Sequence, residues 1–147
     1  MPRPLPPETR SSAVSADDPR LLILAHGDSW DRRFQVTSLA ASEAAAGHLV
    51  DIALFFGALH SWSSDAWDAL DPSPPLDARA IEKSGMPPLT TVLQPGRTDD
   101  RIKLYACSAS VRLLGLDAAH VQTRVDAILG WQSFSRMIGR AKQVVTL

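Results

Sequence analysis

The sequence predicts a single α/β domain of the flavodoxin-like class, in which helices cover both faces of a mostly parallel sheet. Short apolar runs alternate along the chain with segments whose apolar residues recur at helical spacing. Continuous apolar runs are typical of parallel strands, because helices bury both faces of such strands. The chain has 147 residues, of which 45 % are hydrophobic, so it can form one core but not two large domains.

The first predicted elements are a strand, a helix and a second strand. Residues 21–25 (LLILA) are all apolar, which predicts a buried strand. Apolar residues then recur at helical spacing from Val36 to Ala44, and Gly47 ends the predicted helix. Residues 49–56 (LVDIALFF) predict the second strand, which a right-handed crossover would place parallel to the first.

The C-terminal half continues this alternation. Residues 101–106 (RIKLYA) predict a third strand, and the short helix after it ends at Gly115. We expect a fourth short strand toward the end of residues 121–129, a helix over residues 132–140 and a last strand over residues 144–147. This order of elements completes an open α/β sheet.

Two segments depart from the pattern. Residues 1–19 are rich in proline, so we expect a disordered tail ahead of a domain that spans residues 20–147. Residues 61–97 form an irregular, proline-rich segment with short helical stretches near residues 78–83 and 89–93. Because a structureless loop of that length is unusual, we expect this segment to be partly helical and to lie near the site or a subunit contact.

Charge and cysteine content exclude several classes of protein. Fifteen Lys and Arg residues against sixteen Asp and Glu residues give a net charge of −1, so no overall positive field attracts nucleic acid or an anionic membrane. No run approaches the ~20 apolar residues that cross a bilayer, and no signal peptide is visible. One cysteine cannot form an intramolecular disulfide. We therefore expect a cytoplasmic protein with no nucleic-acid or membrane partner.

Cys107 is the candidate catalytic residue, because it ends the third predicted strand and begins the following helix. Ligand sites of open α/β sheets lie at the carboxyl ends of the strands. Backbone N–H groups and the helix dipole at such a position favour the thiolate, the nucleophilic form of cysteine. Ser108, Ala109 and Ser110 are small and would leave room to bind a second sulfur atom or a partner's side chain. The alternative is that Cys107 is a small, buried hydrophobic residue.

The order of motifs around Cys107 is also informative. An apolar strand precedes the cysteine, small residues follow it, and an Arg-containing turn ends in Gly115-Leu116. This segment is similar to the cysteine segment of the DsrE/DsrF/TusD-like family of sulfur-relay proteins. Other motifs of that family resemble further parts of this chain, namely residues 21–27, 46–48, 49–57, 128–134 and 141–147.

The resemblance implies a flavodoxin-like subunit that assembles into a homo-oligomer, either a trimer or a hexamer. It further implies that Cys107 accepts persulfide sulfur from a donor protein and passes it to an acceptor protein. Neither a metal nor an organic cofactor is expected in this function. A single cysteine suffices chemically, because the acceptor supplies the next thiol.

Several other residues are candidates for roles beside Cys107. His26 ends the first predicted strand at the same edge of the sheet, where it would either support the thiolate or be a loop histidine bonded to the backbone. The four histidines lack the close spacing of metal ligands, so we expect no metal site. Trp62 and Trp67 would cover a subunit interface unless they belong to the core. The basic residues Arg136, Arg140 and Lys142 would form a docking patch for an acidic partner or a solvated helix face.

Two further functions are compatible with the residues. A non-catalytic binding or scaffold subunit of the same fold would use Cys107 only for packing and would recognise a partner through residues 61–97. Nucleotide or flavin binding at the strand edge is suggested by the fold class alone. The loop after residues 21–25 has one glycine, whereas phosphate-binding loops have several.

Overall fold

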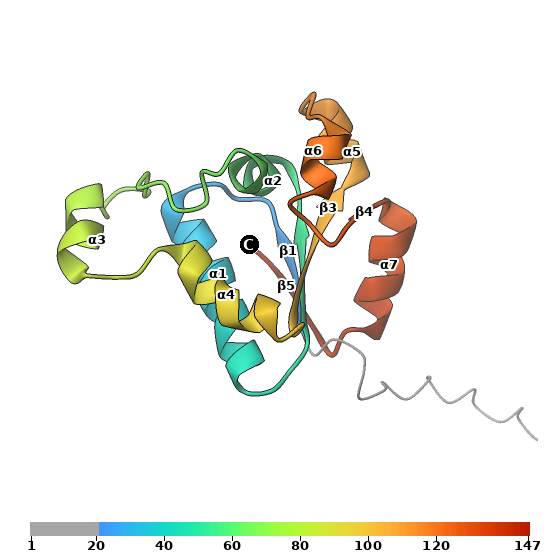
Figure 1. Cartoon of the computed structure of the whole chain (residues 1–147), viewed down its shortest axis with the longest axis horizontal. Helices are drawn as coiled ribbons and strands as arrows, with labels where there is room; N and C mark the ends of the chain where they lie inside the picture. The colour runs from blue at the N-terminus through green and yellow to red at the C-terminus, as the bar shows by residue number, and fades with distance from the viewer. Residues whose placement is uncertain (1–20) are drawn as a thin grey trace, which may run out of the picture.

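The computed structural model describes residues 21–147 and shows a five-stranded, fully parallel sheet between helices (Figure 1). The strands are β1 (Leu21–Ala25), β2 (Val50–Leu54), β3 (Ile102–Cys107), β4 (Ala127–Leu129) and β5 (Gln143–Thr146). They lie in the order β4-β3-β2-β1-β5. The predicted α/β class is confirmed. The expected tail over residues 1–19 lies outside the described residues.

The helices are distributed unequally over the two faces of the sheet. They are α1 (Trp30–Ala45), α2 (Phe56–Ser63), α3 (Ala78–Ser84), α4 (Leu89–Thr98), α5 (Ser108–Leu113), α6 (Ala118–Gln122) and α7 (Trp131–Arg140). Successive connections from β1 to β4 move in one direction, so right-handed crossovers put α1 and α4 on one face. The connection from β4 to β5 runs back across the sheet, which places α7 on the opposite face (Figure 1).

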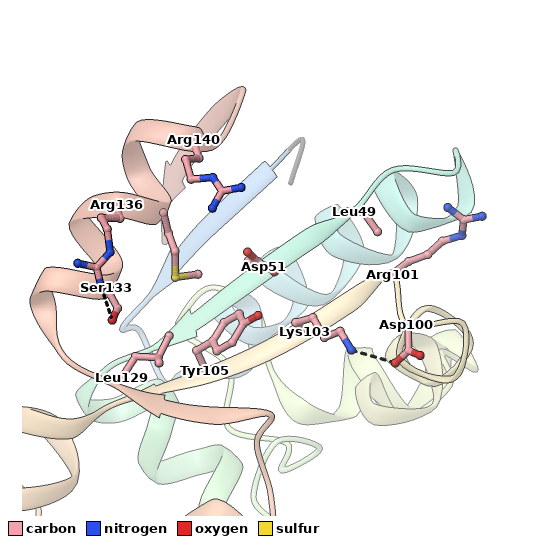
Figure 2. A pocket seen from close by; sticks show the side chains of 11 residues that line it. Leu49, Asp51, Asp100, Arg101, Lys103, Tyr105, Leu129, Ser133, Arg136 and Arg140 are labelled. Atoms are coloured by element: carbon pink, nitrogen blue, oxygen red, sulfur yellow. Dashed lines mark hydrogen bonds and ion pairs between the residues drawn. The ribbon is translucent and has the colours of Figure 1, made fainter. Parts of the chain in front are cut away.

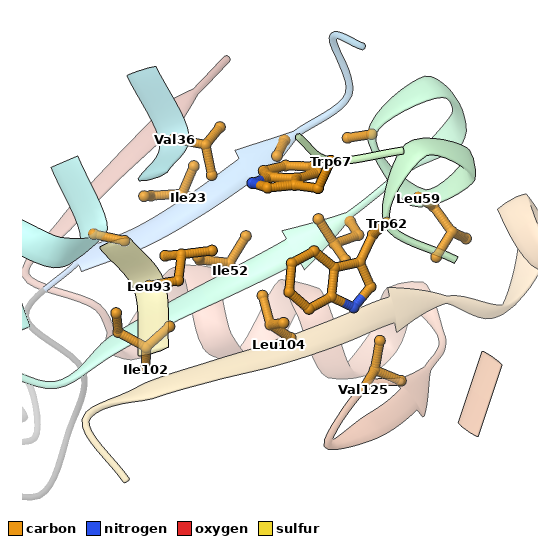
Figure 3. Close-up of a cluster of buried hydrophobic side chains, with 14 of the residues drawn as sticks. Ile23, Val36, Ile52, Leu59, Trp62, Trp67, Leu93, Ile102, Leu104 and Val125 are labelled. Atoms are coloured by element: carbon orange, nitrogen blue, oxygen red, sulfur yellow. The ribbon is translucent and has the colours of Figure 1, made fainter. Parts of the chain in front are cut away.

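The larger core lies between the sheet and the helices α1 and α4. Trp62 and Trp67 are buried in it with their rings in a T-shaped arrangement, 5.5 Å between centroids (Figure 3). Their indole N–H groups donate to the carbonyl of Arg124 at 2.8 Å and to the Thr37 hydroxyl at 3.0 Å, respectively. The expectation that these two tryptophans cover a subunit interface is wrong, because their rings fill the space above the sheet within one chain.

The smaller core lies under α7. Its buried members are Leu22, Ala53, Phe55, Cys107 and Phe134. Within the described chain, Phe134 is the only buried side chain of α7. A single helix with one buried anchor therefore covers this face of the sheet, which leaves part of β2 and β3 open.

The chain between β2 and α2 differs from the prediction. The strand predicted over residues 49–56 is shorter, since it ends at Leu54, and Phe56 already begins α2. Gly57 does not end an element but lies inside α2, where a Cβ would come within 2.9 Å of the Cβ and Cγ atoms of Asp28. The start of α2 therefore packs closely on the loop after β1. Neither α2 nor α6 was predicted from the sequence.

The irregular segment between β2 and β3 is partly helical, as predicted, and a buried arginine holds its first part. The guanidinium of Arg33, on α1, donates to the carbonyls of Ala66, Trp67 and Ala69 and pairs with the Asp71 carboxylate. Its bonds to Trp67 and Ala69 measure 2.7 and 3.0 Å. Arg33 thus satisfies the Trp67 carbonyl and adds a second donor to the carbonyls of Ala66 and Ala69, which already accept backbone N–H groups.

Candidate functional site

Cys107 lies where the sequence predicted it, at the carboxyl end of β3. It is the last residue of the strand and the N-cap of α5. The backbone N–H of Ser110 donates to its Sγ atom at 3.5 Å. In the sheet, Cys107 is paired in register with Leu129, the last residue of β4.

The chain leaves these two neighbouring strands toward opposite faces of the sheet. After β3 it enters α5, whose Val111 packs into the larger core. After β4 it enters α7, whose Phe134 packs into the smaller core. Adjacent strands whose connections diverge in this way form a topological switch point, the usual ligand site of an open α/β sheet. Cys107 therefore occupies the position of this fold at which ligands ordinarily bind.

The thiol is nevertheless closed off from solvent. Cys107 is 1 % exposed and belongs to the same buried group as Phe55 and Phe134. The expectation that small neighbours leave the sulfur reachable is wrong, because Ala109 packs against this group and Ser110 is fully buried. Ser108 is partly exposed.

An aromatic cluster connects the buried thiol with the surface. Phe55 stacks on Trp131 at 5.1 Å between ring centroids and lies 5.2 Å from Phe134. Trp131 and Phe134 are 5.9 Å apart in a T-shaped arrangement. Trp131 is 56 % exposed, so it forms the outer end of the cluster. Two of the three rings come from the first turn of α7, and displacement of that turn would open the space around Cys107.

Ser110, whose backbone N–H donates to the thiol, also carries an unsatisfied polar group. The residue is completely buried, and its hydroxyl has no hydrogen-bond partner among the described residues. A buried hydroxyl without a partner costs about 1–3 kcal/mol. Such groups are few in native proteins, and a role in binding or catalysis is one explanation for them.

His26 is not brought to Cys107. Its exposed side chain follows β1, whereas Cys107 ends β3, and β2 lies between the two strands. Two strand spacings of about 4.8 Å separate the backbones of β1 and β3. No hydrogen bond within residues 21–147 joins the His26 ring to the thiol, and the backbone N–H of His26 donates to the Leu147 carbonyl at 2.8 Å. The predicted support of the thiolate by His26 is therefore absent from the structure.

A pocket that the sequence did not predict lies on the open part of the sheet, beside α7 (Figure 2). Its volume is about 480 Å³, and Asp51, Lys103 and Tyr105 line it from β2 and β3. Arg136 and Arg140 line it from α7. The sequence does contain a sign of this pocket, because Lys103 and Tyr105 occupy alternate positions of β3. A strand buried on both faces would be apolar at these positions.

The environment of this pocket changes the acidity of its floor. Burial, and next the charge of Asp126, raise the pKa of Asp51 to about 6, although Lys103 partly opposes the effect. Burial is also the main cause that raises the pKa of Tyr105 to about 12, followed by the charges of Asp51 and Asp126. Asp51 takes part in none of the ion pairs within residues 21–147.

Substitution of Asp51 by asparagine is expected to stabilise the protein by ~2 kcal/mol at pH 7.5. The unfolded chain releases the Asp51 proton near the ordinary aspartate pKa of 3.8, whereas the folded protein keeps it up to about pH 6. Between these values the folded state binds more protons, so this carboxyl lowers stability as the pH rises. Urea unfolding at pH 7.5 and pH 4 measures the effect, which should be much smaller at pH 4, close to the pKa of the unfolded chain. Asp100→Asn, at an exposed carboxylate of the same pocket, should change stability little.

Comparisons with known proteins bear on the fold alone. No family model matches the chain, and no curated protein matches its sequence. The protein of unknown function MTH1491 from Methanobacterium thermoautotrophicum is similar in structure, with a TM-score of 0.60 and 16 % identity over 88 % of this chain and 100 % of that one. The conserved protein of unknown function BT1422 from Bacteroides thetaiotaomicron gives a TM-score of 0.59 and 11 % identity over 87 % and 95 % of the two chains.

Membrane-spanning helices and clusters of metal ligands are both absent from the described residues. No helix within residues 21–147 combines the length and the apolar composition needed to cross a bilayer. In the same part of the chain, no three His, Cys, Asp or Glu side chains form a group suited to a metal ion.

Proposed function

We propose that the protein is a DsrE-like sulfur carrier in which Cys107 bears the transferred sulfur as a persulfide. The observation that carries the proposal is the position of the chain's single cysteine at the switch point between β3 and β4. The N–H of Ser110, which donates to the sulfur, and the unpaired hydroxyl of the same residue add support. The order of motifs around Cys107 in the sequence is the basis for the proposed family.

The proposed step exchanges one sulfur atom without net oxidation. The Cys107 thiolate attacks the outer sulfur of a persulfide on a donor protein, and the S–S bond of the donor breaks as the Cys107 persulfide forms. The donor leaves as a thiolate. An acceptor thiolate then attacks the outer sulfur of the Cys107 persulfide. The acceptor keeps this sulfur as its own persulfide, and Cys107 is released as a thiolate. Ser110 N–H donation would stabilise the Cys107 thiolate before the first attack and after the second.

Transfer requires access that the closed arrangement around Cys107 lacks. The proposal therefore includes an outward movement of the first turn of α7, which carries Trp131 and Phe134. Because α7 has a single buried side chain, the free energy needed to open it locally is expected to be smaller than that of global unfolding. Donor and acceptor proteins of the cytoplasm would be the partners.

Incubation with a cysteine desulfurase and cysteine is expected to add the mass of one sulfur atom to the folded protein. Cys107→Ser should show no gain, because no other cysteine is present. Ser108→Ala keeps the thiol and should gain the sulfur, which makes it the matched control. Native mass spectrometry of the same samples also tests the trimer or hexamer implied by the family. A wild-type protein that stays unmodified, although its thiol reacts fully in denaturant, would contradict the proposal.

The burial of Cys107 favours a second candidate, a binding or scaffold subunit in which the thiol only packs. In that case Cys107→Ser would alter stability slightly and leave the binding of partners intact. The two candidates give opposite results in the mass measurement, since a purely structural thiol acquires no sulfur from the desulfurase.

A further inference from the structure

The pocket beside α7 is separate from the switch point. Cys107 does not line it, so an inference about this pocket does not depend on sulfur transfer. Its volume of about 480 Å³ lies within the range of about 300–1,000 Å³ typical of small-molecule sites. The described strands and α7 enclose it on two sides, with an opening toward solvent between them (Figure 2).

The charged residues of the pocket are mostly basic. Four cations, Arg101, Lys103, Arg136 and Arg140, line it together with two carboxylates, Asp51 and Asp100. These six side chains leave an excess of two positive charges when both acids are ionised. The C-terminal segment after Asp126 contains no acidic residue that could neutralise α7 from its own sequence.

Lys103, Arg101 and Arg136 differ in the groups that compensate their positive charges. Lys103 forms an ion pair with Asp100 at 2.9 Å, and Arg101 donates to the Gly47 carbonyl at 2.7 Å. By contrast, Arg136 donates to the neutral Ser133 hydroxyl at a long 3.4 Å. Arg136 therefore keeps most of its capacity to pair with an anion. Arg140 lies four residues further along α7 and thus on the same side of the helix.

Apolar surface lies directly next to these cations. Leu129 of β4, Met137 of α7 and the ring of Tyr105 line the same pocket. A ligand that fits has to carry an anionic group for the arginines of α7 and an apolar body for this surface. Inorganic anions satisfy only the first requirement, and neutral apolar molecules only the second.

We infer that the pocket between α7 and the open face of β2 and β3 binds a small organic anion. Its carboxylate, sulfonate or phosphate group would pair with Arg136 and Arg140, and its apolar part would contact Tyr105, Leu129 and Met137. Asp51 lies on the floor of the pocket and repels the anion whenever it is ionised, so the site binds more tightly when Asp51 is protonated.

Benzenesulfonate is a suitable probe, because its charge stays constant through the relevant pH range and its ring is apolar. Titration into the full-length protein, followed by amide NMR, is expected to shift the signals of Tyr105, Ser133 and Met137. Arg136→Gln should weaken the affinity about tenfold. Arg112→Gln, on the exposed side of α5 and outside the pocket, should leave it unchanged.

The pH dependence tests the role of Asp51 separately. Wild-type affinity should rise several-fold between pH 7.5 and pH 5, since the pKa of Asp51 is about 6. Asp51→Asn should bind more tightly at pH 7.5 and lose the dependence. The other charged and titratable groups that line the pocket with Asp51 are Asp100, Arg101, Lys103, Tyr105, Arg136 and Arg140, and Asp126 acts on Asp51 from outside it. A dependence that persists in Asp51→Asn would mean that a group other than Asp51 causes it, and this part of the inference would be wrong.

Three results would overturn the inference. One is the absence of shifts at the amides of the pocket. Another is equal binding at these residues of benzylamine or benzyl alcohol, which match the ring but carry a positive charge or none. The third is an equal effect of Arg136→Gln and Arg112→Gln. The fold of each variant is checked by its amide spectrum without ligand.

Discussion

Replacement of Arg33 by methionine is expected to lower the free energy of unfolding by about 3–5 kcal/mol. Arg33 is completely buried on α1, and its guanidinium donates to three carbonyls of the loop after α2. Methionine fills much of the same volume but removes the donor of the Trp67 carbonyl, and it leaves the Ala66 and Ala69 carbonyls with one backbone donor each. Chemical denaturation measures the loss, and hydrogen exchange of residues 66–71 should show that this loop opens first.

Two further variants separate the hydrogen bonds of Arg33 from its charge. Arg33→Lys keeps the charge, but one ammonium group cannot reach the acceptors that the planar guanidinium bridges, so most of the loss should remain. Asp71→Asn removes the ion pair at its exposed end and should cost less than about 1 kcal/mol. If Arg33→Met were as stable as the wild type, the bonds to the carbonyls would contribute little to stability.

The role of Arg33 shows which kind of information the sequence does not contain. The helix around it was predicted, because apolar spacing and Gly47 are local signals. The acceptors of Arg33 lie 33 to 38 residues further along the chain, so no local pattern identifies them. The same holds for Trp62 and Trp67, whose burial depends on their packing against a distant part of the sheet.

The candidate site was predictable in its position and not in its environment. A strand, a cysteine and small residues ahead of a helix locate Cys107 at the sheet edge from sequence alone. Phe134 buries the thiol from the face of the sheet opposite to α1 and α4. It lies on that face because the connection after β4 runs back across the sheet. Strand order decided this outcome, and it also separated His26 from the thiol. The polar residues Lys103 and Tyr105 were visible in the sequence, but only the single-helix cover of that face gives them a pocket.

Replacement of Phe134 by alanine is expected to have two large effects. The ring is completely buried and anchors α7, so its loss should destabilise the protein by about 3–5 kcal/mol. It also removes the largest side chain that α7 contributes to the group around Cys107. The rate at which the native thiol reacts with a disulfide reagent should therefore rise, and loading from the desulfurase should become faster in parallel.

Ile138→Ala is the matched control, since Ile138 lies one turn further along α7 and is exposed. This variant should change stability and thiol reactivity little. Phe134→Ala could also raise reactivity through global unfolding, which low concentrations of urea distinguish from local opening. A rate that stays constant as urea is added reports a local movement of α7, whereas a rate that climbs steeply reports exposure of the whole core. The second result would mean that α7 does not open on its own, and the access step of the proposed sulfur transfer would have no structural basis.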